Sequence, residues 1–122
     1  MNHLLYISIA VILSNNLLIK NPVVHIGKIK VGQKKEITFI IKNNNAKPIK
    51  ILSVSSTCGC TIPKYPGVLP ANKNTEITAI FDSKGMTGFV KKDLVLVVED
   101  QLKFYKLSFT CEVISSPTSL LP

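Results

Sequence analysis

The sequence contains no arginine and no tryptophan, so all 15 basic residues are lysines. Lysine carries a point charge without the planar fork of arginine, which removes bidentate recognition of guanine or phosphate. Proteins that bind nucleic acid usually cluster their charge among aromatic residues, whereas these lysines are scattered. We therefore expect no nucleic-acid partner despite the net charge of +8. The lysines are interpreted as solvated residues on strand faces and sheet edges.

Residues that could support catalysis are also scarce. The chain has two histidines, His3 and His25, and its acidic residues are isolated except for Glu99-Asp100. Catalysis needs a nucleophile with a base, paired carboxylates or a metal ion. His25 alternates with apolar neighbours, which is typical of a histidine on a surface or an edge strand. We therefore expect neither enzymatic activity nor a bound cofactor.

The longest apolar run, "LLYISIAVIL", extends from Leu4 to Leu13. A bilayer-spanning helix needs about 20 apolar residues, so no integral membrane domain is expected. The run fits the apolar part of a signal peptide, although Met1-Asn2-His3 carries no lysine or arginine. We predict a signal peptide or N-terminal apolar segment over residues 1–20 and an extracytoplasmic location, in the periplasm or at the cell surface. No cysteine precedes Cys58, so anchoring through a lipidated N-terminal cysteine is not expected. An uncleaved anchor and an extra N-terminal strand are the alternatives.

After residue 20 the sequence alternates between apolar and polar residues with a period of two, the period of a half-buried strand. The alternation slips near Leu52, which indicates a bulge. Residues 63–74 are rich in proline and are predicted to form a long loop, and residues 115–122 a loose tail. The expected strands are 23–29, 36–42, 49–56, 76–82, 92–100 and 104–114. Residues 92–100 are apolar on both faces, so this strand is expected to be central. The alternation predicts that the inward faces carry Ile37, Phe39, Ile41, Ile77, Ala79, Phe81, Tyr105, Leu107, Phe109, Cys111 and Val113. This spacing predicts an all-β protein, an antiparallel β-sandwich of about seven strands over residues 21–114.

Cys111 falls in phase with the inward-facing residues Leu107, Phe109 and Val113, so it is predicted to be a buried free thiol. In the usual strand order, the strand that ends near Ser56 and the last strand flank a shared neighbour. Their backbones are then about 10 Å apart, beyond the ~7 Å limit for a disulfide. No bridge from Cys111 to the other cysteines is expected.

The other two cysteines form the motif Cys58-Gly59-Cys60. In an extended segment both sulfurs point to the same face, where they could chelate a soft ion such as Cu(I). An oxidising location also allows a disulfide, but a bridge across one residue closes a tight ring that is easily reduced. A metal site at Cys58 and Cys60 lacks further ligands nearby, so we favour a structural role in which the two small apolar thiols pack and a permissive Gly59 lets the chain turn. A partner-binding role of the surrounding loop is the third interpretation.

Two long segments, "GKIKVGQKKEITFIIKNNNAKPIKILSVSSTCGCTIPKYP" and "LPANKNTEITAIFDSKGMTGFVKKDLVL", resemble the bacterial domain of unknown function 1573. The resemblance covers residues 23–113. It implies an immunoglobulin-like sandwich, related to pilus-chaperone (PapD) and ASH (MSP-like) domains, in a usually exported protein. The residues that carry the motif are Cys58, Gly59, Cys60, Thr61, Asp82, Gly85 and Gly88. Unlike an antibody domain, the chain has no tryptophan, so an aliphatic core with a few aromatic rings is expected.

These observations favour a non-catalytic, exported β-sandwich of the bacterial cell envelope. It would dock an unknown envelope protein through a sheet edge or loops, or act as a structural accessory. The alternative is a small thiol-based copper or redox protein that uses Cys58 and Cys60.

Overall fold

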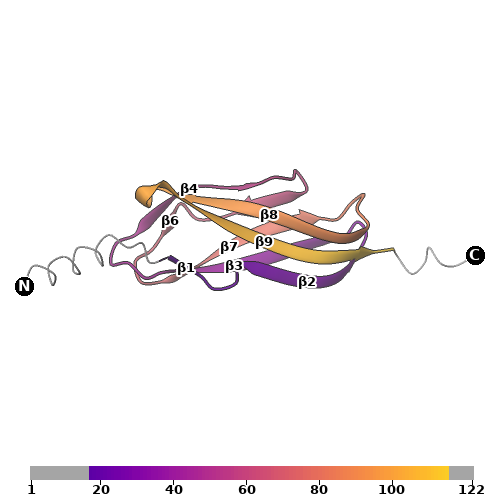
Figure 1. The fold of residues 1–122 in the computed structure, drawn as a ribbon, viewed down its shortest axis with the longest axis horizontal. Coiled ribbons are helices and arrows are strands. Elements are labelled where there is room, and N and C mark those ends of the chain that lie inside the picture. Colours follow the sequence, from indigo (N-terminus) through magenta and orange to yellow (C-terminus); the bar gives the residue numbers. More distant parts are fainter. Residues whose placement is uncertain (1–16, 116–122) are drawn as a thin grey trace, which may run out of the picture.

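The computed structural model of the protein describes residues 17–115, which form two β-sheets packed face to face (Figure 1). One sheet has four strands in the order β1-β3-β7-β5, and the other has five in the order β2-β9-β8-β4-β6. The strands are β1 (Leu17–Ile19), β2 (Val23–Lys30), β3 (Lys34–Asn43), β4 (Ile49–Ser56), β5 (Thr61–Lys64), β6 (Val68–Leu69), β7 (Asn74–Asp82), β8 (Gly88–Val98) and β9 (Lys103–Ile114). The predicted all-β, immunoglobulin-like sandwich is confirmed.

The core lies between the sheets and contains the side chains that the alternation predicts to face inward. Phe81 of the four-stranded sheet and Phe109 of the five-stranded sheet meet edge to face, with ring centroids 5.1 Å apart. The alternation predicts that Tyr105 belongs to the core with these residues, but it is only partly buried and packs at the margin of the core. The predicted inward residues that are buried are Ile37, Phe39, Ile41, Ile77, Ala79, Phe81, Leu107, Phe109, Cys111 and Val113.

Local features of the five-stranded sheet also follow the sequence. The register between β4 and β8 shifts between Ile51 and Ser53, which confirms the predicted bulge. β8 lies between β9 and β4, as its apolar residues on both faces predict. A short 3-10 helix, η1 (Asp100–Leu102), closes the hairpin from β8 to β9.

One strand pair is parallel, which the sequence pattern did not indicate. The chain leaves β1 in the four-stranded sheet and crosses at Asn21-Pro22 to β2, which pairs with β9 in parallel. The backbone N–H of Ser108 donates to the carbonyl oxygen of Pro22 at 2.8 Å and so begins the new ladder. β2 therefore forms one edge of the five-stranded sheet.

The prediction of a continuous loop over residues 63–74 is wrong, because β5 and β6 lie within or across this range. β5 contains Pro63, opposite Ala79 of β7. The N–H of Asp82 donates to the carbonyl of Cys60 at 2.8 Å, and hydrogen-bonded pairs alternate along an antiparallel ladder. The nitrogen of Pro63 therefore faces away from β7. Proline is tolerated in an edge strand in that orientation.

The predicted N-terminal segment, residues 1–20, overlaps β1, which pairs Leu17 with Asn43 of β3. The remainder of that segment, residues 1–16, lies outside the described residues, as do residues 116–122 of the predicted tail. The signal peptide and the loose tail thus stay predictions.

Candidate functional site

Cys58-Gly59-Cys60 forms the turn at which the chain passes from β4 in the five-stranded sheet to β5 in the four-stranded sheet. The N–H of Cys58 donates to Ser56 Oγ at 3.1 Å, and the N–H of Thr61 donates to the carbonyl of Cys58 at 3.3 Å. The Cα atoms of the two cysteines are 5.2 Å apart, whereas an extended chain would place them about 6.6 Å apart. The segment is therefore turned and not extended, so the expectation that both sulfurs point to the same face does not apply to it.

Gly59 is not required by the backbone of this turn. Its φ is not positive, and a Cβ built on it would meet no atom within 4 Å. The chain does turn here, but its geometry does not require glycine at position 59.

A disulfide joins Cys58 to Cys60, and both residues are half-buried. In this state neither sulfur is a thiolate, so a metal would need the reduced pair, and the proposed copper site stays a prediction. Within residues 17–115, no cluster of three or more His, Cys, Asp or Glu side chains is placed to hold a metal ion.

Cys111 is a free thiol and is 1% exposed, as predicted. The strands β9 and β4 flank β8. This is the strand order on which the expectation of no disulfide from Cys111 to Cys58 or Cys60 is based. Burial raises the pKa of the Cys111 thiol, so the neutral form is favoured.

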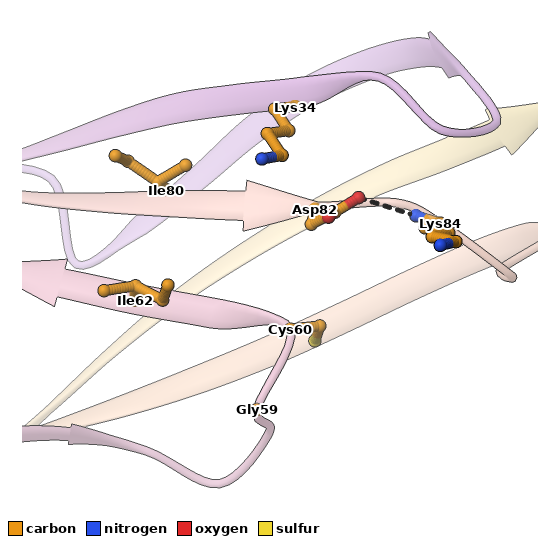
Figure 2. A pocket seen from close by; sticks show the side chains of 7 residues that line it. All are labelled: Lys34, Gly59, Cys60, Ile62, Ile80, Asp82 and Lys84. Carbon is orange, nitrogen blue, oxygen red and sulfur yellow. Dashed lines mark hydrogen bonds between the residues drawn. The ribbon is translucent and has the colours of Figure 1, made fainter.

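The other motif residues, Asp82, Gly85 and Gly88, lie close to the cysteine turn. Asp82 is hydrogen-bonded to Cys60 through the backbone, and Thr61 lies opposite Phe81. The turn that follows β7 is fixed by Asp82 Oδ1, which accepts the N–H of Lys84 at 3.0 Å (Figure 2). The glycines of this turn have φ values of +75° at Gly85 and +79° at Gly88, a conformation that favours glycine. The motif residues Cys58, Gly59, Cys60, Thr61, Asp82, Gly85 and Gly88 therefore gather at one end of the four-stranded sheet.

A pocket of about 280 Å³ opens beside the turn, on the outer face of the four-stranded sheet. Ile62, which is 61% exposed, lies opposite Ile80 and gives the pocket an apolar floor. Figure 2 shows Cys60 at the start of β5 and Ile62 farther along the same strand. The lining residues are Lys34, Gly59, Cys60, Ile62, Ile80, Asp82 and Lys84. The sequence did not point to Lys34, Ile62, Ile80 or Lys84 as residues of a site. The one available signal was Ile80 itself, an apolar residue at an outward position of β7.

At the cysteine turn the strand β4 stops pairing with β8, so within residues 17–115 one edge of β8 is unpaired beyond this point. β4 pairs with β8 only from Leu94 to Val98, because the chain leaves the five-stranded sheet after Ser56. Among the described residues, the segment Gly88–Asp93 pairs with β9 and with no other strand. Phe89 in this segment is 78% exposed. An open backbone edge thus lies beside an exposed aromatic ring.

The direction of the free N–H groups follows from the register. The N–H of Glu99 donates to the carbonyl of Lys50, on the β4 side of β8. Donors alternate between the two sides of a strand, so the N–H groups of Phe89, Lys91 and Asp93 face the open edge. The neighbouring edge strand β5 differs, because the N–H of Thr61 is used within the turn and Pro63 has none.

His25 is exposed on the edge strand β2, as predicted. Its Nδ1 lies 2.6 Å from Thr110 Oγ1 on β9. This hydrogen bond joins two neighbouring strands and fits the interpretation of a surface histidine.

The sequence profile of the family described as "Protein of unknown function (DUF1573)" matches residues 17–113. The chain belongs to this family. The match covers most of the chain, including the cysteine turn at Cys58–Thr61 and the turn from Asp82 to Gly88. The comparison with curated proteins finds no match.

Solved structures with the same fold include members of several protein classes. A protein of unknown function from Porphyromonas gingivalis is 14% identical with a TM-score of 0.69, over 81% of this chain and 47% of that chain. This chain thus spans about half of that protein. The ASH/PapD-like domain 7 of human CEP192 is 12% identical with a TM-score of 0.72, over 85% and 89% of the two chains. The Vibrio cholerae protease VesB is 12% identical with a TM-score of 0.63, over 81% of this chain and 32% of that chain. These likenesses establish a PapD-like sandwich fold.

Proposed function

We propose that this chain is a non-catalytic protein-interaction module that acts outside the cytoplasm, in the bacterial cell envelope. The observation that carries the proposal is the open edge of β8 at Gly88–Asp93, beside Phe89. An extended peptide can add to such an edge, with affinity from main-chain hydrogen bonds and specificity from side-chain contacts.

The exposed side chains along this edge indicate the chemistry of the partner. Phe89 offers an apolar contact, and Lys91 lies two residues along the strand, on the same face. The chain carries a net charge of +8, which favours approach of an acidic partner. At the edge itself the charges are mixed, because Glu112 lies opposite Phe89 and Asp93 follows Lys91 on the same face. The proposed partner is therefore an acidic protein that contributes an extended segment with an apolar residue for Phe89.

The fold supports an interaction role more than a catalytic one. The chain covers 89% of the human PapD-like domain, so that likeness extends over a whole domain. In contrast, it covers only 32% of the VesB chain and 23% of a family 123 glycoside hydrolase from Clostridium perfringens. In those hydrolases the likeness extends over a minor part of the chain and gives no reason to assign catalysis here.

The Cys58–Cys60 disulfide supports an extracytoplasmic location, because disulfides persist mainly in oxidising compartments. Among the described residues, no helix is long and apolar enough to cross a membrane. Because Leu17 pairs with Asn43 within the sandwich, we expect a signal peptidase to cut before that residue. Mass spectrometry of the protein from its native host should detect this cleavage, and an intact Met1 on cytosolic protein would reject export.

The docking proposal is tested by photo-crosslinking in the native host. A photoreactive phenylalanine analogue at position 89 should give a discrete adduct with one other envelope protein. The same analogue at Phe104, which is 67% exposed on the same sheet near its other end, is the matched control and should not give that adduct.

A backbone variant then tests strand addition itself. Lys91→Pro removes an N–H that faces the open edge but keeps the ladder to β9, so it should abolish the adduct. Lys91→Ala keeps this N–H and should retain most of the crosslinked adduct. The circular dichroism spectra of both variants should match that of the original chain. An adduct that survives Lys91→Pro, or one formed only between copies of this chain, would reject the proposal.

A further inference from the structure

The Cys58–Cys60 disulfide contributes little to holding the chain in its fold. The stabilisation by a disulfide increases with the length of the loop that it closes, and this bridge spans a single intervening residue. The turn is also held by hydrogen bonds from Cys58 to Ser56, from Thr61 to Cys58 and from Asp82 to Cys60. These bonds stay available when the two sulfurs are separated.

The two sulfurs have different surroundings. Cys60 lines the pocket on the outer face of the four-stranded sheet (Figure 2), although it is half-buried and packs in part against the core. The pocket is the side from which we expect an incoming thiolate to approach it. The backbone N–H of Cys60 points at Cys58 Sγ with a separation of 3.2 Å. Among the described residues, Cys60 Sγ has only the Thr61 hydroxyl as a possible donor, at the longer distance of 3.7 Å. The shorter contact from the backbone N–H stabilises negative charge on Cys58 more, so Cys58 is the better leaving group when the bond breaks.

The charges around the pocket favour an anionic nucleophile. Lys34 and Lys84 both line it, together with the single carboxylate of Asp82. Within the described residues, the ion pair that forms joins Lys106 to Asp93, and neither lysine of the pocket takes part in one. Nearby cations lower the free energy of a thiolate, both as it attacks and as Cys60 is released.

We propose that Cys58–Cys60 is a thiol–disulfide exchange site that accepts electrons from a dithiol of a partner protein. A partner thiolate attacks Cys60 Sγ, the Cys58–Cys60 bond breaks, and the electron pair leaves on Cys58, which takes a proton from water. The partner's second thiolate then attacks the partner sulfur of the mixed disulfide, and Cys60 is released as a thiolate, which also takes a proton from water. Two electrons thus pass to this chain and the partner gains a disulfide. The two protons that the partner's thiols lose to water balance the two that Cys58 and Cys60 take up. This activity goes beyond peptide docking at β8 and does not depend on it.

The first test is equilibration of the full chain with mixtures of reduced and oxidised glutathione, followed by acid quenching, alkylation and mass spectrometry. The pair should convert between disulfide and dithiol within the range that glutathione buffers, while the circular dichroism spectrum stays unchanged. Cys111 should stay unmodified throughout, because it is 1% exposed. A pair that is reduced only after the chain unfolds in denaturant would show a structural disulfide and overturn the proposal.

The second test uses the pocket charges. Lys34→Gln combined with Lys84→Gln should slow reduction by glutathione, which is anionic, by about threefold or more, and should speed reduction by cysteamine, which is cationic. Lys42→Gln combined with Lys73→Gln is the matched control, since it also removes two charges, at the other end of β3, and should change neither rate. If glutathione and cysteamine each reduce all variants at the same rate as the original chain, the pocket does not guide the exchange. That result would overturn the assignment of Cys60 as the attacked sulfur.

Discussion

The cysteines of this chain lie in two contrasting regions. Cys111 is packed among inward-facing side chains of β9 and stays a neutral thiol. Cys58 and Cys60 lie at a half-buried turn and are bonded to each other. Cys111 is a member of the buried core, whereas Cys60 only packs against its margin and the turn is held by backbone hydrogen bonds. A thiol is inert where packing excludes water and more reactive where it is partly exposed.

The largest effect is expected from a truncation beside Cys111. Phe109→Ala removes a fully buried ring that contacts Phe81 across the sandwich, so it should lower the free energy of unfolding by about 3 to 5 kcal/mol. Urea denaturation measures this loss. Phe104→Ala on the same strand removes a ring that is 67% exposed and should cost at most about 0.5 kcal/mol. Similar losses for the two variants would contradict the assignment of the core.

A smaller effect is expected at Cys111 itself. Cys111→Ser keeps nearly the same volume but buries a hydroxyl, which should destabilise the fold by about 1 to 3 kcal/mol. Cys111→Ala removes the sulfur and adds no polar group. If burial governs this position, the serine variant is no more stable than the alanine variant, although serine is closer to cysteine in size. A serine variant as stable as the original chain would indicate that water reaches the site.

Much of the fold could be predicted because alternation reports which residues face inward. It identified Phe39, Phe81 and Phe109 as core residues and placed the bulge near Leu52. It could not identify β5, because Pro63 is a loop signal unless its nitrogen is known to face a free edge. That orientation depends on a partner strand distant in the sequence.

The candidate site was predicted only in part. The motif at Cys58–Thr61 and the turn after Asp82 were both recognised, but their contact depends on the register between β5 and β7. Lys34 joins them from a third strand, and no local pattern indicates its position. Outside the site, no local pattern indicates that Asn43 is buried either, because its Nδ2 donates to the carbonyls of Lys47 and of the distant Leu69 at 3.0 Å. Local patterns predict strands and turns, whereas a site made by several strands requires their pairing.

Replacing both turn cysteines should have a smaller effect than either change in the core. The double substitution Cys58→Ser and Cys60→Ser removes a bridge that closes a very short loop, so it should cost about 1 to 2 kcal/mol. Urea denaturation of the oxidised chain and the variant measures this difference. A loss well above that range would show that packing of the two sulfurs dominates.

The same variant tests the copper interpretation. The reduced original chain and the variant are titrated with Cu(I) in the presence of a competing chelator. Two sulfurs without a third ligand nearby should bind the ion weakly in both cases. Tight, stoichiometric binding by the reduced chain that is absent from an equally stable variant would establish a metal site at Cys58 and Cys60.

The smallest effect is expected at the glycine between the two cysteines. Gly59 has no positive φ and has free space where a Cβ would lie. Gly59→Ala should therefore change stability by no more than about 0.5 kcal/mol, with a slight gain if the less flexible unfolded chain dominates. Gly85→Ala is the matched control, because φ there is +75° although the space is equally free. That substitution should cost about 1 kcal/mol. Thermal unfolding of both variants decides the comparison, and a Gly59 variant as destabilised as the Gly85 variant would show that the cysteine turn relies on its glycine.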